Sequence, residues 1–363
     1  MQPFASTAVN EPGRGMLVCQ CYGNMSKFER IHAQYPLKFI PTSGHATRLA
    51  VVYMLSYGGG IISGDTFNID IVVKKDAILL LMTQGNTKVF KDRVDQRLWL
   101  TSLGNLVPTI QFFNTREQQT AVKPSVQIIH SQVEPQATLL VLPDPVTCFR
   151  DASFQSKQVF HLADSSQLVL LDWFTCGRLT RGEVWSFRHY SSRIDVHVNQ
   201  KIVIKDAMVL EDEEYMKKKE KETAYAERLH PYLCFATLII ISSGQGALSE
   251  CVRDLQKKSE AMRLLPLSLN SEKERQVLWS VSPIMKNRGV LVRMAGMTTE
   301  LVRDFVKHEC LVHLQQIVGE DCSSLNFWYK DGSCLRKSTR SLSSCQSFNT
   351  FSIFIICHCT SGW

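Results

Sequence analysis

Three carboxylates stand out because each lies in a stretch whose glycine or proline residues restrict the backbone around it. Asp65 ends YGGGIISGD at residues 57–65, Asp144 lies in LPDPVTCF at 142–149, and Glu183 lies in LVLLDWFTCGRLTRGEVWSF at 168–187. Glycine permits tight turns and proline fixes φ, so these side chains are held in place. Separate carboxylate oxygens suit a divalent cation that must be bound without being enclosed. The three residues are therefore candidates to bind a divalent cation weakly.

Two other interpretations of the same carboxylates stay open. Paired carboxylates can act as general acid and base, so the alternative function is a carboxylate-dependent hydrolase. Against it, the chain has no HExxH motif and no nucleophile elbow, and its ten histidines are scattered singly. The other interpretation is structural: Asp65 could accept N–H bonds within its turn, and Glu183 could pair with Arg178 or Arg181.

Neither the glycine cluster nor the cysteines predict a compact ligand site. A phosphate loop leads from a strand into a helix, whereas residues 66–73 alternate apolar and polar side chains and predict a strand. Twelve cysteines spread over a long chain without an export signal predict reduced thiols. Before the C-terminal tail, Cys19 and Cys21 come nearest to a metal-binding pair, and they fit half-buried cysteines better than metal ligands.

Five blocks together resemble one known family. They read GGGIISGD at 58–65, TQGNTKVF at 83–90, LPDPVTCF at 142–149, DWFTCGRLTRGEVW at 172–185 and RMAGMTTE at 293–300. In this order and at these separations they resemble the successive blocks of the UreD (UreH) family of urease accessory proteins, over about residues 15–328. The resemblance implies a structural motif made by Gly59, Gly60, Gly64, Thr83, Gln84, Lys88, Asp172, Trp173, Gly177, Arg178 and Gly182.

The resemblance also implies a function. Members of the family are scaffolds for urease maturation that catalyse nothing themselves. They bind UreF, which recruits the GTPase UreG, and the assembly docks on apo-urease in the cytoplasm, with a dimer of heteromers expected through UreF. Nickel passes through the assembly, so nickel is expected only in transit and no cofactor is expected to be bound permanently. On this interpretation Asp65, Asp144 and Glu183 line the nickel route.

The elements that must position these residues are mostly strands. Residues 66–73 alternate in polarity, and residues 194–198 with 202–204 predict a hairpin. Short apolar runs predict further strands that are covered on both faces, at 77–82, 138–142, 167–171 and 236–241. The expected class is mainly β, and the resemblance specifies a β-helical scaffold with a few α-helices in the C-terminal third.

Two helices are predicted from apolar periodicity, the first at residues 249–265. Thr298 or Thr299 can cap the second helix, and Gly319 can end it. The apolar stripe of this second helix is wide for a helix that is covered on one side only, so part of it is expected to contact a partner. The residues predicted to bind that partner are Leu301, Phe305 and Val312.

Composition excludes several other classes. The chain has 363 residues, 44% of them hydrophobic, and a net charge of +7 from dispersed Lys and Arg, which does not predict nucleic-acid binding. The apolar run at 348–357 is about half of the roughly 20 residues that a membrane helix needs, and residues 1–15 lack a secretory signal.

We expect a flexible N-terminus at 1–15, a single domain at 16–328 with a charged insertion near 211–230, and a poorly ordered Ser/Cys-rich tail at 329–363.

Overall fold

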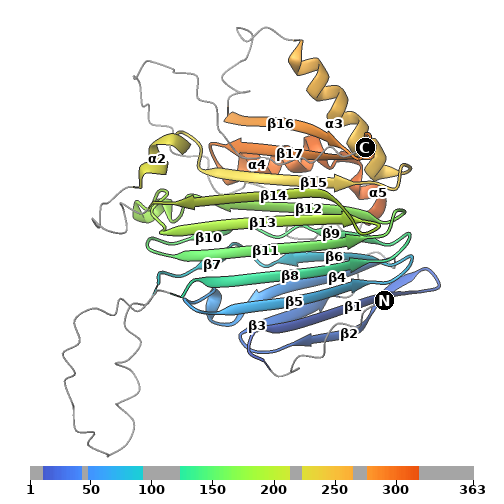
Figure 1. Ribbon diagram of the computed structural model, residues 1–363, viewed down its shortest axis with the longest axis horizontal. Helices are drawn as coiled ribbons and strands as arrows, with labels where there is room; N and C mark the ends of the chain where they lie inside the picture. Colours follow the sequence, from blue (N-terminus) through green and yellow to red (C-terminus); the bar gives the residue numbers. More distant parts are fainter. Residues whose placement is uncertain (1–10, 43–47, 93–122, 213–222, 265–275, 319–363) are drawn as a thin grey trace, which may run out of the picture.

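The computed structural model describes residues 11–42, 48–92, 123–212, 223–264 and 276–318, and most of them form two sheets (Figure 1). The seven-stranded sheet contains, in spatial order, β14 (Lys201–Glu211), β13 (His189–Val198), β11 (Ser153–Leu162), β8 (Ser125–Val133), β5 (Thr66–Val73), β1 (Arg14–Tyr22) and β2 (Met25–Ala33). The ten-stranded sheet contains β16 (Val277–Ile284), β17 (Gly289–Gly296), β15 (Cys234–Ile241), β12 (Gln167–Thr175), β9 (Thr138–Val141), β6 (Ile78–Thr83), β4 (Leu49–Ser56) and β3 (Leu37–Thr42), with β7 (Thr87–Val89) and β10 (Val146–Cys148) at its side. The predicted mainly β class is confirmed.

The chain alternates between the two sheets, so that successive strands stack as coils. Strands β5, β8, β11 and β13 pair in parallel in one sheet, and β4, β6, β9 and β12 pair in parallel in the other. Each coil therefore lies on the preceding one, which is the β-helical arrangement that the family resemblance implies. Antiparallel strands complete both sheets at the C-terminal end of the stack, with β14 in one and β15, β16 and β17 in the other.

Two apolar cores cover the ten-stranded sheet, one on each face. Leu81 of β6 lies in the core between the sheets, and its neighbour Leu80 lies in the core on the outer face. On that outer face α3 (Ala247–Arg263) contributes Leu248 and Leu255, and α4 (Thr299–Phe305) contributes Val302. Strands buried on both faces need apolar side chains at every position, which explains the continuous apolar runs in the sequence.

Three short turns form one edge of the coil, at residues 74–77, 134–137 and 163–166. In each turn the backbone N–H of the fourth residue donates to the C=O of the first at 3.1 Å. All three fourth residues are buried, and they are Ala77, Ala137 and Ser166. We call these three turns the turn edge.

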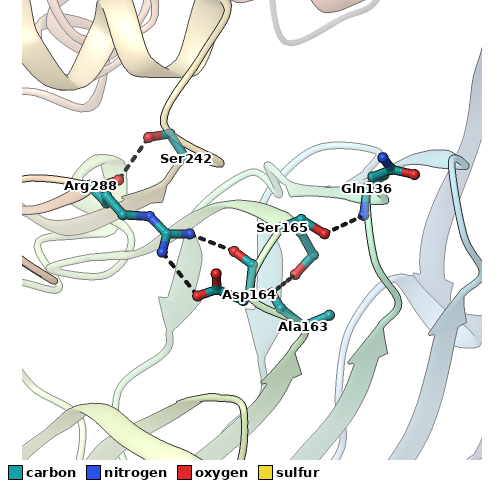
Figure 2. Close-up of polar contacts among 7 residues, drawn as sticks. Gln136, Ala163, Asp164, Ser165, Ser242 and Arg288 are labelled. Atoms are coloured by element: carbon teal, nitrogen blue, oxygen red, sulfur yellow. Dashed lines mark hydrogen bonds and ion pairs between the residues drawn. The ribbon is translucent and has the colours of Figure 1, made fainter.

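Side chains join the turn edge to its neighbours (Figure 2). The Oγ of Ser165 accepts a hydrogen bond from the backbone N–H of Gln136 at 3.2 Å, which links two successive turns. Arg288, in the turn between β16 and β17, donates to the Asp164 carboxylate at 2.9 Å and to the Asp164 carbonyl at 2.5 Å. The turn edge is thus tied together by local and mostly exposed contacts.

The predicted hairpin and the first predicted helix are confirmed. Strands β13 and β14 pair antiparallel across Asn199 and Gln200, which both have positive φ as a tight hairpin turn requires. Helix α3 covers almost the range predicted for the first helix. A short helix, α2 (Ala224–Leu229), was not predicted, and it lies in the segment that we interpreted as a charged insertion.

The second predicted helix is not continuous, so that part of the prediction is wrong. Thr298 caps α4 as expected, because its Oγ1 accepts from the Leu301 N–H at 3.2 Å. The chain then passes through a π-helical turn (Val306–Cys310), a 3₁₀ turn (Val312–Leu314) and α5 (Gln315–Val318). Leu311 leaves helical geometry at φ −116° and ψ 31°, which breaks the hydrogen-bond ladder. Gly319, the predicted end, lies outside the described residues.

The predicted termini fall largely outside the described part of the chain. Residues 1–10 and 319–363 are not described, so the flexibility expected of the N-terminus and of the tail stays a prediction. Strand β1 begins at Arg14, inside the segment 1–15. Among the described residues, no helix has both the length and the apolar character needed to cross a membrane.

Candidate functional site

The first four sequence blocks lie side by side on the edge of the coil where the chain passes from the ten-stranded to the seven-stranded sheet. The Ile61 N–H donates to Lys88 O at 2.7 Å, and the Phe90 N–H donates to Ile61 O at 2.9 Å. The Phe149 N–H in turn donates to Val89 O at 3.0 Å, and β10 pairs in parallel with both β7 and the end of β12. We call the residues 57–65, 83–90, 142–149 and 173–187 the motif edge. Strands β7 and β10 mark it on the left of Figure 1.

The fifth block reaches the same end of the ten-stranded sheet. Thr175 at the end of β12 pairs with Cys234 of β15, and Cys234 pairs with Gly296 of β17. Thr298, two residues after Gly296, caps α4. Blocks that are far apart in sequence are thereby brought together by strand register.

The glycines of the first block serve two different purposes. Gly58 and Gly59 have φ values of 80° and 77°, a left-handed conformation that side chains disfavour. Gly60 is extended, but a Cβ there would lie 2.6 Å from the carbonyl oxygen of Lys88. Asp65 closes the turn, since its Oδ2 accepts the Ile62 N–H at 2.9 Å. The structural alternative for Asp65 is therefore present in the structure, and its place on a metal route stays a prediction.

Asp144 is held by two other segments, residues 83–85 and α4. Its backbone N–H donates to Thr83 Oγ1 at 2.7 Å, and its Oδ2 accepts the Gly85 N–H at 2.8 Å. Arg303 of α4 donates to the other carboxylate oxygen, Oδ1, at 3.2 Å. The side chain keeps 14% of its surface exposed, so a small ion can reach it from solvent. Trp173 fixes the same turn by donating its indole N–H to Pro143 O at 2.8 Å.

Glu183 forms a closed pair with Arg178, as the structural interpretation expected. The guanidinium donates to both carboxylate oxygens, one of them at 2.8 Å, and lies 3.9 Å from the ring centroid of Phe149. Burial alone would raise the pKa of Glu183, but hydrogen bonds from Arg178 and from the Arg150 N–H outweigh burial, so the pKa lies below its ordinary value. Gly182 supports the preceding turn (Leu179–Arg181) in a left-handed conformation.

A ladder of polar side chains also runs along the motif edge. Asn86 donates its side-chain amide to Thr147 Oγ1 at 3.0 Å, and the hydroxyls of Thr147 and Thr175 are 2.9 Å apart. Both threonines are buried. Sequence analysis did not single out Thr147 or Thr175, because an isolated threonine in a strand indicates no ladder until its neighbours are known.

A second polar group lies between the two sheets, around Asp172. Ser192 donates to Asp172 at 2.6 Å and Gln158 donates at 3.2 Å. Burial raises the pKa of Asp172, because a desolvated carboxylate disfavours its charge. Nearby, Arg293 of β17 pairs with Asp206 of β14 at 2.5 Å, which joins the two sheets.

Only Asp172 of this group was singled out from the sequence. The alternation of polar and apolar residues along the strands contained a signal for Ser192 and Asp206. Ser192 occupies an inward position between the apolar Tyr190 and Ile194, and Asp206 occupies one between Ile204 and Met208. A polar residue in an apolar row indicates a buried polar network.

The remaining predicted residues are distributed between rim and core. Thr83 is buried, and Gly177 is tightly packed, because a Cβ there would lie 2.9 Å from Glu183 O. Gln84 and Lys88 are exposed. Gly64 has a φ of 86°, which suits its turn.

The residues predicted to bind a partner lie in and just after α4. Phe305 packs on Trp279 with ring centroids 5.4 Å apart, Leu301 is partly exposed, and Val312 is 51% exposed. Other members of the stripe, Val302 and Leu314, are buried in the outer core. The partner-binding role of Leu301, Phe305 and Val312 stays a prediction.

The described residues contain no compact metal site. Within them, no group of three or more His, Cys, Asp or Glu side chains is arranged to hold a metal ion. The described cysteines are all free thiols, and burial raises the pKa of Cys19 to about 12, which keeps it protonated. The arrangement places separate carboxylates on one edge of the coil.

Comparison with known proteins gives a consistent result. A family model described as UreD urease accessory protein matches residues 11–329. The chain is 30% identical over 325 residues to urease accessory protein D of Arabidopsis thaliana, an alignment that covers 84% of this chain and 98% of the plant protein. It is 29% identical over 307 residues to an uncharacterized ureD-like protein of Schizosaccharomyces pombe, covering 82% and 92% of the two chains. It is 28% identical over 309 residues to UreD of Sorangium cellulosum, covering 85% and 82%.

Proposed function

Because the chain belongs to the UreD family of urease accessory proteins, we propose that it acts as a non-catalytic scaffold that helps load nickel into apo-urease. On this proposal the chain works in the cytoplasm. It binds UreF directly and UreG through UreF, and the resulting assembly is a dimer of heteromers. The observation that supports the proposal most directly is that four sequence blocks lie side by side on the motif edge, with the fifth at the same end of the ten-stranded sheet.

The chemistry of the motif edge suits transfer better than storage. Ni²⁺ is held tightly by closed sets of nitrogen and sulfur ligands, whereas carboxylate oxygens and water bind it more weakly and exchange. Asp65 and Asp144 lie at separate turns, so each would bind an ion only briefly, and Glu183 would offer its oxygens only when it parts from Arg178. We infer that these three residues line the route.

The same geometry weighs against a carboxylate-dependent hydrolase. A general acid that works near neutral pH needs a raised pKa, and the pKa of Glu183 is lowered by its partner Arg178. Asp65 and Asp144 accept backbone N–H bonds in separate turns. Assay of the purified chain against model esters, amides and glycosides is expected to show no turnover.

Co-expression with urease tests the proposal. Apo-urease, UreF and UreG are produced with the wild-type chain or with Asp65, Asp144 and Glu183 changed to Ala, singly and together. The wild-type chain is expected to raise the nickel content and activity of urease, and the triple variant to lose most of that effect while still purifying with UreF. Full nickel loading by an intact triple-variant complex would remove these residues from the route. Loss of the complex would assign the three residues to structure.

A further inference from the structure

The ion pair between Arg303 and Asp144 differs from the other arginine–carboxylate pair at the motif edge. In the pair between Arg178 and Glu183, the guanidinium donates to both carboxylate oxygens and lies 3.9 Å from an aromatic ring. Arg303 makes one contact with Asp144, at 3.2 Å, and lies 5.7 Å from the ring centroid of Trp173. Charge-assisted N–H···O bonds are usually about 2.7–2.9 Å long, so this contact is a loose one.

Arg303 is also incompletely satisfied. Its Nε is buried and has no hydrogen-bond partner among the described residues. A buried donor without a partner is unfavourable, so Arg303 gains less from this position than a bidentate arginine would. Asp144 is held independently of Arg303, because the Gly85 N–H binds Oδ2 and Thr83 binds the Asp144 backbone. If Arg303 moves away, the carboxylate stays in place.

We propose that Arg303 is a tethered competitor for the metal: its guanidinium occupies, at Asp144 Oδ1, the position that a divalent cation takes during transfer. This inference rests on the proposed function of the chain in nickel loading. The cation displaces Arg303 on arrival, and Arg303 returns to the carboxylate when the cation leaves. The exchange breaks one ion pair and forms another at the same oxygen, so no uncompensated charge is left on Asp144. Arg303 is therefore a positioning residue that keeps the affinity for the ion low.

Nickel titration of the purified full-length chain tests the competition. In Arg303→Met the competing charge is removed, and the affinity for Ni²⁺ measured by isothermal titration calorimetry is expected to rise about five- to tenfold; tenfold corresponds to about 1.4 kcal/mol. Arg303→Lys retains a cation and is expected to stay near the wild-type affinity. The gain should disappear when Asp144→Asn is added to Arg303→Met.

Arg288→Met provides the matched control. It removes an arginine from another ion pair with an aspartate, Asp164, on the turn edge (Figure 2). Its affinity for Ni²⁺ is expected to equal that of the wild type. Where Arg303→Met does not fold, Arg303→Gln removes the charge while keeping an N–H donor for Asp144, and it should give the same gain.

Two results would overturn the inference. One is an unchanged affinity for Ni²⁺ in a folded Arg303→Met or Arg303→Gln variant, which would make Arg303 a structural link between α4 and the turn at 142–149. The other is a gain in affinity that survives Asp144→Asn. The proposed function fails by a different result, namely wild-type chain that does not raise urease activation in co-expression. The two failures are therefore distinguishable.

Discussion

The motif edge and the turn edge connect the same two sheets but do so in different ways. The turn edge uses the same hydrogen-bonded four-residue turn three times, with the unrelated sequences KKDA, EPQA and ADSS. Only the last residue of each turn is buried. The motif edge uses longer segments, and together these segments contain left-handed glycines, buried polar groups and two ion pairs. Since four residues suffice to pass from one sheet to the other, the additional structure of the motif edge is not needed to close the coil. This difference supports the proposal that the functional residues lie at the motif edge.

The largest loss of stability is expected at Gly60, where the motif edge leaves no space for a side chain. Gly60→Ala places a Cβ 2.6 Å from Lys88 O, so backbone must shift, and a loss of roughly 3 kcal/mol or more in the free energy of unfolding is expected. Gln136→Ala on the turn edge should change it by less than about 1 kcal/mol, because that side chain is exposed. Urea denaturation followed by circular dichroism measures both. Equal effects would show that the two edges are equally tolerant.

At two other glycines of the same block, backbone strain alone should cause a smaller loss in the free energy of unfolding. Gly59 and Gly64 have φ values of 77° and 86°, with nothing near Gly59 for a side chain to strike. Changing either to Val is expected to lower the free energy of unfolding by about 1–3 kcal/mol through backbone strain. Unaltered denaturation midpoints in both variants would contradict this expectation.

A loss of stability of intermediate size is expected when the polar ladder is broken. Thr147→Val removes a buried hydroxyl and leaves Asn86 and Thr175 without their shared partner, for a loss of about 1–3 kcal/mol. Ser165→Ala removes the hydroxyl that accepts the Gln136 N–H on the turn edge, where water can replace it, so the loss should stay below about 1 kcal/mol. Thermal denaturation of the two variants in parallel decides whether the ladder is the stronger link.

Acid should weaken the motif edge through Glu183. Its folded-state pKa lies below the ordinary value of 4.5, so its contribution to stability is fully present above pH 4.5 and is lost as the pH falls through the folded-state pKa. Glu183→Gln should therefore be less stable than wild type at pH 7, and the difference should shrink as the pH falls below 4.5. A pH series of denaturation curves measures the difference. A gap that is constant with pH would contradict the assigned ion pair.

The smallest effect is expected for Arg288→Met on the turn edge. Asp164, its partner, is 62% exposed, and exposed ion pairs contribute about 0–1 kcal/mol. Urease activation in co-expression should stay at the wild-type level, because this residue is remote from the motif edge. A clear loss of activation would show that the turn edge also takes part in function.

Local pattern was sufficient to predict several strands and one hairpin, but not how the coils pair with one another. The apolar run at 77–82 predicts a strand covered on both faces, and β6 has that environment. The contact of Arg303 with Asp144 joins residues 159 positions apart, and its existence depends on the register of the whole sheet. No period in the sequence encodes that register. The resemblance identified the blocks, and the structure brings them together.

The broken second helix has a similar explanation. The apolar stripe from Leu301 to Ile317 has helical spacing, which predicts one continuous helix. In the fold, Leu311 and Leu314 are drawn into the outer core, and His313 contacts Asp254 of α3 at 2.9 Å. Tertiary packing on α3 thus overrides the local helical preference. The missed helix α2 lacks the length that a periodicity argument requires.

The outer core also constrains how the chain is synthesised. The outward faces of β4, β6, β9 and β12 carry Val51, Leu80, Leu140 and Val169, which belong to the same outer core as apolar side chains from residues 247–318. A ribosome delivers the coils first and their cover last, so an apolar sheet face is exposed until the end of this region has emerged. A nascent or truncated chain that stops before α3 therefore presents an aggregation-prone surface. Early engagement by a folding chaperone would protect it.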